Sequence, residues 1–305
     1  MAAPIVFIHR GNSFYLPFTL GQARFRSGAN PLVLLGDASN AALGGKNGVQ
    51  HELLNNYPHS RAVFEAAYVH LSLETFEFEQ FCFSRWFLLR DYVVDKKLEA
   101  VWHLDSDVML YTSLAEEEDW IKHYDAAYCH AGVPAVLYIT ATTLHRFCDF
   151  ILDLYTQRLP YLHNCFENYK EKNPGIVWGG ITDMHAFWLF AKEERADVAD
   201  ISRVQNGAVF DQDIHQHQGF VMDASRGEKL VRWQGKQPYF VGATNKLVTR
   251  ANSLHWASSA RKTMHRYYTG PGLFWLSLQR EALFKLKALK SALKIRKRLG
   301  FLLRN

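Results

Sequence analysis

A pair of aspartates at the end of an apolar segment constrains this chain more than any other feature of its sequence. Residues 101–111 read VWHLDSDVMLY, so Asp105 and Asp107 stand one residue apart between two hydrophobic runs. Carboxylates this close repel each other, and both stay ionised at neutral pH only when a cation or several donors compensate them. Oxygen ligands suit Mg²⁺ or Mn²⁺, which also bind phosphate oxygens. The pair therefore predicts a metal-assisted phosphate site, and a turn with solvated aspartates is the other interpretation.

Strand and helix patterns alternate in the first half of the chain. Apolar runs typical of buried strands occupy residues 4–9, 31–37 and 100–105, and a shorter one lies near 63–69. Helices are predicted up to about Arg26 and over about 74–94. Such alternation predicts an α/β, Rossmann-like fold with a mostly parallel central sheet flanked by helices. Ligands of such sheets bind at the carboxyl ends of the strands, where the aspartates stand.

The second half has weaker signals. Strands are predicted at residues 126–130 and 135–140, and helices at 142–157 and 181–194. Residues 197–250 mix short strand patterns with turns, and no repeat or linker divides them. One domain with an elaborated C-terminal half is the simplest organisation.

The positive charge of the chain is concentrated at its C-terminus. The net charge is +5, yet residues 276–305 hold nine basic residues and one acidic residue, so residues 1–275 carry a net charge of −3. This asymmetry favours a local electrostatic contact over a nucleic-acid groove. We expect residues 276–305 to form a basic amphipathic helix that contacts an anionic membrane surface, or else docks on the body of the protein.

Other features of the sequence predict a cytoplasmic protein. Four widely spaced cysteines form no metal or disulfide pattern, so we expect reduced thiols. The chain has no secretory signal and no apolar run long enough to cross a membrane. The inner face of the membrane is the expected place for a peripheral contact.

The segment before and through the aspartate pair resembles the nucleotide-sugar glycosyltransferases of the GT-A fold. Residues 81–111 read FCFSRWFLLRDYVVDKKLEAVWHLDSDVMLY. In that family a helix bearing an arginine precedes a strand that ends in the D-x-D motif, and the motif binds Mn²⁺ or Mg²⁺. The resemblance implies that Asp105 contacts the ribose or the metal, that Asp107 is a metal ligand, and that Arg85 approaches the nucleotide or its sugar.

A late segment is similar to the H-x-x-G-x-x-K motif of retaining members, such as bacterial lipopolysaccharide galactosyltransferases and glycogenin. Residues 252–266 read NSLHWASSARKTMHR. The resemblance implies that His255 completes the metal site and that Arg261 or Lys262 meets the leaving diphosphate. The sequence departs from the motif at Ser258, where the family has glycine, and at Arg261, where it has lysine.

The family resemblance also assigns contacts to the nucleotide and to the sugars. The end of the first strand faces the base and ribose in this fold, so the candidate nucleotide contacts are His9, Asn12, Tyr15 and Asp37. In related enzymes an acidic residue at the corresponding point of the chain lies beside the transferred sugar. Asp183 is therefore a candidate sugar-binding or catalytic carboxylate. Candidate acceptor or sugar contacts are Trp178, Gly179, Gly180, Asp211 and Asp213.

Together these features predict a metal-dependent glycosyltransferase that uses a UDP-hexose and extends a glycan or a lipid-linked acceptor with retention. The predicted catalytic domain spans residues 1–275, with a nucleotide-binding half at 1–110, an acceptor-binding half at 111–275 and the tail at 276–305. Three alternatives stay open. They are an inverting transferase with Asp183 as base, a metal-dependent nucleotidyltransferase or phosphohydrolase, and a non-catalytic glycan-binding protein.

Overall fold

The computed structural model describes residues 2–45, 48–194 and 196–272. The predicted basic helix at 276–305 lies outside the described residues. Within them, no helix combines the length and the apolar character that crossing a membrane requires.

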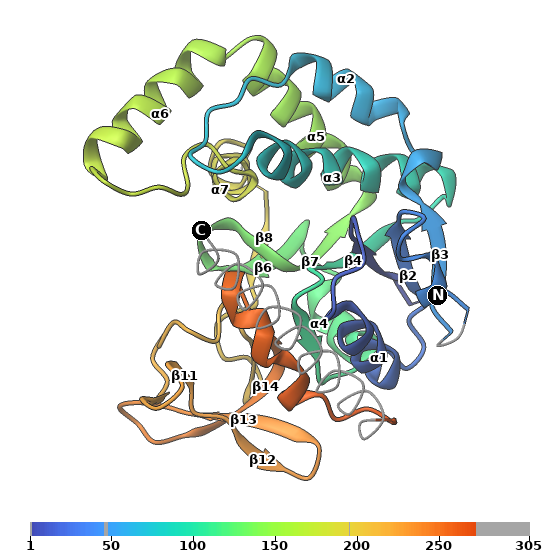
Figure 1. Cartoon of the computed structure of the whole chain (residues 1–305), viewed down its shortest axis with the longest axis vertical. Coiled ribbons are helices and arrows are strands. Elements are labelled where there is room, and N and C mark those ends of the chain that lie inside the picture. The colour runs from blue at the N-terminus through green and yellow to red at the C-terminus, as the bar shows by residue number, and fades with distance from the viewer. Residues whose placement is uncertain (1, 46–47, 195, 273–305) are drawn as a thin grey trace, which may run out of the picture.

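A seven-stranded sheet forms the centre of the molecule (Figure 1). Its spatial order is β3-β2-β1-β4-β7-β6-β8, and only β7 runs against the other strands. The strands are β1 (Ile5–Ile8), β2 (Leu32–Gly36), β3 (Gln50–Leu53), β4 (Ala100–Leu104), β6 (Ala126–Cys129), β7 (Val133–Thr140) and β8 (Val198–Asp200). The predicted α/β fold with a mostly parallel sheet is confirmed.

Helices cover both faces of this sheet. They are α1 (Leu16–Arg26), α2 (His59–Ala67), α3 (Phe76–Asp95), α4 (Leu114–Ile121), α5 (Ala141–Thr156), α6 (Leu159–Lys172) and α7 (Asp183–Glu193). One face packs on α2, α3, α5 and α7, and the other packs on α1 and α4. Alternate residues of β1 pack into the hydrophobic cores on the two faces of the sheet. Val6 and Ile8 pack on the face covered by α2, α3, α5 and α7, and Ile5 and Phe7 pack on the face covered by α1 and α4. Both faces of the central strands are therefore buried, which explains their unbroken apolar runs.

A second, smaller sheet continues from the aspartate pair. Its strands are β5 (Val108–Leu110), β9 (Ala208–Phe210), β12 (Arg232–Gln234), β13 (Gln237–Val241) and β14 (Val248–His255). A short ribbon of β10 (Met222–Asp223) and β11 (Glu228–Lys229) lies beside it. Because β5 pairs with β14 in the register His255 to Val108, the end of β14 meets the aspartate turn.

Four short 3-10 helices complete the described chain. They are η1 (Ala41–Leu43), η2 (Leu54–Asn56), η3 (His130–Gly132) and η4 (Ser258–Tyr267).

The expected strand near 63–69 was wrong, because this apolar segment belongs to helix α2, where Ser60 and Phe64, four residues apart, are buried on one face. Strand β3 was not predicted. It is an edge strand whose side chains are all at least partly exposed. Helix α6 was not predicted, and Leu162 is its only fully buried residue.

Candidate functional site

A tight reversal between β4 and β5 places the aspartate pair at the junction of the two sheets. The backbone N–H of Asp105 donates to the carbonyl of Ala135 (2.8 Å), and the N–H of Val108 donates back to the carbonyl of Asp105 (3.0 Å). The flanking strands are buried. The two carboxylates therefore stand at the carboxyl end of a central strand, where α/β sheets bind ligands.

His255 joins the two aspartates. One ligand atom each of Asp105, Asp107 and His255 lies within 4.8 Å of the others. The β5–β14 pairing explains this convergence of residues that are far apart in sequence. The structure thus brings together the three residues that the sequence resemblance assigned to a metal.

The imidazole of His255 is held in one orientation. Its Nδ1 lies 2.5 Å from the carbonyl oxygen of Gln212, so Nδ1–H donates there, and Nε2 lies 3.6 Å from Oδ1 of Asp107. Burial alone would lower the pKa of His255, but the hydrogen bond and charge of Asp107 raise that pKa to about 9. An anchored Nδ1 is the usual arrangement of a metal-ligating histidine, because it fixes the tautomer that presents Nε2.

Two arginines neutralise the aspartates. Nε of Arg261 lies 2.7 Å from Oδ2 of Asp107, and Nη1 of Arg85 donates to Oδ1 of Asp105. Burial raises the pKa of Asp105, but the charge of Arg85 and the hydrogen bond from His103 outweigh burial and hold that pKa well below its usual value. The sequence left two forms of compensation open, a bound cation or several donors, and favoured the cation. The protein itself supplies part of that compensation.

The site still fits a divalent metal. Oδ2 of Asp105 has no hydrogen-bond partner among the described residues, and Oδ1 of Asp107 faces only His255. Each of the three residues therefore keeps an atom for an ion. Because Arg85 also pairs with Asp183, three carboxylates and two guanidinium groups leave a net negative charge here, which favours binding of a divalent ion. Carboxylate oxygens and an imidazole nitrogen form a donor set that suits Mn²⁺.

His103 supports Asp105 from inside the core, a role that sequence reasoning missed. Its ring is fully buried, with Nδ1 3.2 Å from the carbonyl of Val6 and Nε2 3.2 Å from Oδ1 of Asp105. Because side chains two residues apart in a strand share a face, a histidine two positions before Asp105 was the available signal.

Asp183 reaches the site through Arg85. It is buried in the first turn of α7, where the side chain of Thr182 caps the helix by accepting from the N–H of His185 (3.3 Å). Oδ2 of Asp183 accepts from Nη2 of Arg85 (2.7 Å) and from Nε1 of Trp86 (3.0 Å). One guanidinium therefore connects Asp105 at the end of β4 with Asp183 at the start of α7.

Two of the four candidate nucleotide contacts adjoin the aspartates. His9 hydrogen bonds with Oγ of Ser106, in the aspartate turn, at 2.9 Å, and burial lowers the pKa of His9. The ring of Tyr15 is buried and lies 5.6 Å from Cζ of Arg261.

The other two lie farther from the pair. Asp37 is used within its own loop, where it accepts from the N–H groups of Gly11 (2.6 Å) and Ser39 (2.8 Å). Asn12 is exposed.

Asp211 has a different place from the one expected. Its side chain is fully enclosed, with Oδ1 bonded to the buried ammonium of Lys229 and Oδ2 accepting from the N–H of His255 (3.1 Å). A sugar cannot reach it, so the expectation of an acceptor contact is wrong for Asp211. Asp213 accepts from the N–H of His215 (2.9 Å) and from Gln216 (3.2 Å), which closes the loop after Asp211.

The remaining candidates are on the surface. Trp178 is 61% exposed, and its carbonyl accepts from the hydroxyl of Tyr169 (3.0 Å). Gly180 has φ +118°, and a Cβ there would lie 2.8 Å from the carbonyl oxygen of Leu71, so only glycine fits. Lys262 is exposed on η4.

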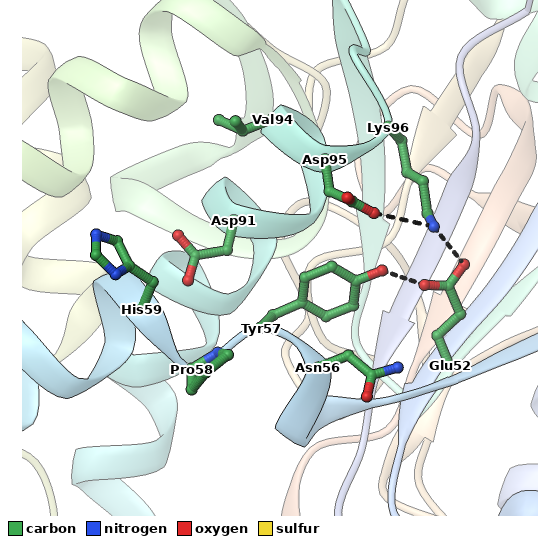
Figure 2. Close-up of a pocket in the computed structure, with 9 residues that line it drawn as sticks. All are labelled: Glu52, Asn56, Tyr57, Pro58, His59, Asp91, Val94, Asp95 and Lys96. Atoms are coloured by element: carbon green, nitrogen blue, oxygen red, sulfur yellow. Dashed lines mark hydrogen bonds and ion pairs between the residues drawn. The ribbon is translucent and has the colours of Figure 1, made fainter.

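Neither of two pockets on the surface encloses the aspartate pair. The larger, of about 500 Å³, lies between η2, α2 and the end of α3 (Figure 2). Three of its charged groups pair with one another, since Lys96 contacts Glu52 (3.3 Å) and Asp95 (3.1 Å). The smaller, of about 360 Å³, lies at the ends of β2 and β3 beside Arg10 and Asp37, next to His9.

No family model and no curated protein matches the chain. Among similar solved structures, the galactosyltransferase LgtC with donor and acceptor sugar analogues is 15% identical, covering 90% of this chain and 94% of its own, with a TM-score of 0.49. The bifunctional glycosyltransferase WbbM in its apo form is 12% identical over 90% of this chain and 51% of its own (TM-score 0.46). Mouse xyloside xylosyltransferase 1 in its apo form is 10% identical, and the match covers 66% of this chain and 85% of the xylosyltransferase chain (TM-score 0.43). All three of these similar structures are named as glycosyltransferases.

Proposed function

We propose that this protein is a metal-dependent glycosyltransferase that moves a hexose from a UDP-sugar to a glycan or lipid-linked acceptor. The convergence of Asp105, Asp107 and His255 beside Arg261 is the observation that carries the proposal. These groups suit a diphosphate bound through Mn²⁺ or Mg²⁺, held by the three ligands. When bound, the ion would neutralise charge on the leaving diphosphate.

Arg261 and Lys262 are the proposed cations at the diphosphate. Arg261 already lies at the site through its contact with Asp107, and Lys262 is its exposed neighbour. A fixed positive charge beside the leaving group stabilises the charge that accumulates as the bond to the sugar breaks.

Arg85 and Asp183 are the proposed contacts of the transferred hexose. Nε of Arg85 is buried and has no hydrogen-bond partner among the described residues, and an orphaned buried donor of this kind is explained when a ligand supplies the acceptor. Asp183 is buried and hydrogen-bonded to Arg85, which favours binding of sugar hydroxyls over proton abstraction. This supports the retaining course, in which the acceptor attacks on the face of the leaving group.

The two halves of the proposed catalytic domain, residues 1–110 and 111–275, share this site. The first half supplies His9, Arg85 and the aspartate pair, and the second supplies His255 and Arg261. Exposed Trp178, which offers a flat ring for stacking against a sugar, with Gly179 and Gly180, is the proposed acceptor side. A cytoplasmic location and membrane contact by residues 276–305 remain predictions.

Thermal unfolding with UDP and Mn²⁺ tests the proposal. The wild type is expected to melt several degrees higher with both than with either alone, because a ligand that binds only the folded state stabilises it. Asp107→Ala should lose this effect, and Asp119→Ala, which removes an exposed carboxylate of α4, should keep it. A wild type that UDP and Mn²⁺ do not stabilise together would remove the metal-dependent donor site.

A screen of UDP-sugars for slow hydrolysis then separates the rivals. A transferase hydrolyses one of them in the absence of acceptor. Turnover of a nucleoside triphosphate or a phosphoester instead would identify a nucleotidyltransferase or phosphohydrolase. Glycan binding that is indifferent to UDP, without any turnover, would identify a non-catalytic glycan-binding protein.

A further inference from the structure

We propose that a basic surface far from the aspartates in sequence docks on an anionic lipid bilayer. The surface, called here the basic face, is formed by the end of α1 and the β12–β13 turn. Its residues are Phe25, Arg26, Arg232, Trp233 and Lys236.

Direct contacts join the two segments into one surface. Nη2 of Arg26 donates to the carbonyl of Lys236 (2.8 Å). The ring of Phe25 lies between two cations, with Nζ of Lys236 4.7 Å and Cζ of Arg26 5.0 Å from its centroid. On β12, the ring of Trp233 packs against Tyr111 (5.8 Å between centroids). The ring of Phe25 is thus held beside two basic side chains, and Trp233 is anchored on Tyr111.

Acidic residues are missing from both segments. Residues 11–36 and 230–252 contain no aspartate or glutamate, whereas residues 1–275 as a whole carry a net charge of −3. Glu117 of α4 approaches the same sheet, but it is buried and pairs with Arg250 (3.4 Å). The two segments themselves are therefore purely basic within an otherwise acidic body, which favours an anionic partner.

Exposed aromatic rings favour a lipid partner. Phe25 is 41% exposed and Trp233 is 39% exposed, so each has a buried part that anchors it and a free part. Aromatic rings beside lysine and arginine are typical of surfaces that lie at the boundary between lipid headgroups and acyl chains. A nucleic-acid partner would account for the cations but not for Phe25.

The chain leaves the described structure beside the basic face. The N–H of Thr269 donates to the side chain of Gln22 (2.9 Å), one helical turn before Arg26. The described residues end at Gly272, and residues 276–305 contain nine basic residues and one acidic residue. That segment and the basic face carry the same sign of charge, so the same anionic membrane would attract both.

Vesicle co-sedimentation of the full-length protein tests this inference. The wild type is expected to bind vesicles of phosphatidylcholine with phosphatidylglycerol, and to bind phosphatidylcholine alone weakly. The double variant Arg232→Glu with Lys236→Glu should reduce binding to the anionic vesicles at least about tenfold, because each basic residue near such a surface contributes to the attraction. The matched control Lys170→Glu with Lys172→Glu makes the same charge change on α6 and should bind as the wild type does.

Several outcomes would overturn the inference. Undiminished vesicle binding by the face variant, or equal loss in the control, would mean that the basic face is not the contact. If the double variant bound vesicles as the wild type does but no longer bound a DNA oligonucleotide that the wild type binds, the basic face would be assigned to nucleic acid. A second variant, Phe25→Ser, keeps every charge and should weaken vesicle binding that persists at high salt.

The same variants separate this inference from the proposed enzymatic function. Stabilisation by UDP and Mn²⁺ should be unchanged in both face variants, since none of these residues touches the aspartate site. A protein that binds vesicles but not UDP would keep the membrane surface and lose the donor site.

Discussion

Lys229 and Asp211 form an ion pair whose side chains are 1% and 0% exposed, directly behind His255. Nζ of Lys229 also donates to the carbonyl of Asp213 (2.8 Å) and to Oε1 of Gln218 (2.6 Å). The second oxygen of Asp211 accepts from the N–H of His255, whose ring is bonded to Gln212 in the same loop. This buried pair therefore positions His255, a proposed metal ligand, although neither Lys229 nor Asp211 is itself proposed to bind the metal.

Lys229→Met should destabilise the fold strongly. It leaves the carboxylate of Asp211 buried without its partner, which typically costs about 3–5 kcal/mol. Adding Asp211→Asn should restore much of that loss, because the amide keeps a hydrogen bond to His255 and carries no charge. Urea unfolding measures both. Lys122→Met, which breaks an exposed ion pair with Asp119, should keep a free energy of unfolding within about 1 kcal/mol of the wild type. A similarly small loss for Lys229→Met would contradict the role of the buried pair.

Arg85→Lys should fold but lose activity. A lysine keeps the charge, yet its single ammonium cannot reproduce the planar contacts of Arg85 with both Asp105 and Asp183. We expect hydrolysis of the donor to slow roughly a hundredfold, as when a preorganised donor is removed from a site. Arg158→Lys disturbs a similar two-pronged contact on the surface, with Glu193, and should be silent. Wild-type rates in Arg85→Lys would place the sugar elsewhere.

Binding of Mn²⁺ should strengthen as the pH rises. In the absence of metal, Asp107 raises the pKa of His255 to about 9, so the ion must displace a proton below that pH. Affinity is expected to increase up to about tenfold per pH unit between pH 6 and 9. Titration followed by electron paramagnetic resonance measures this slope, and His255→Gln should flatten it. The same protonated ring stabilises the metal-free fold at lower pH, and that contribution is lost as the pH passes 9.

Glu79 should make the fold less stable as the pH rises. Burial, with a further contribution from the charge of Asp183, raises the pKa of Glu79 to about 8. The folded protein therefore holds a proton that the unfolded chain releases at lower pH, so stability falls between about pH 5 and 8. Glu79→Gln mimics the protonated form and should melt higher than the wild type at pH 8.5 but not at pH 5.5. The exposed Glu77→Gln should leave the profile unchanged, and parallel profiles for wild type and Glu79→Gln would show that the carboxyl is ionised throughout.

The sequence predicted those parts of the site whose signal is local. Asp105 and Asp107 stand at the end of an apolar strand, and Arg85 lies on the helix before it, so a short motif contains all three. The strands of the sheet core were equally visible, because burial on both faces leaves continuous apolar runs.

Long-range contacts account for what the sequence did not predict. Asp211 looked like a sugar ligand in the segment FDQD, because nothing local indicates that Lys229 lies buried against it. Arg261 was expected at the diphosphate, but its contact with Asp107 depends on the register of β14 against β5. Peripheral elements such as β3 and α6 bury few of their side chains, so they lack the continuous apolar runs of the core strands.

The pairing of His255 with Val108 limits how the chain can vary in length. Side chains alternate between the faces of a strand, so inserting or deleting one residue in β14 would turn the imidazole away from the aspartates. The turn between β12 and β13 is not subject to this restriction. Natural relatives of this protein should therefore differ in length at that turn while keeping a constant spacing along β14.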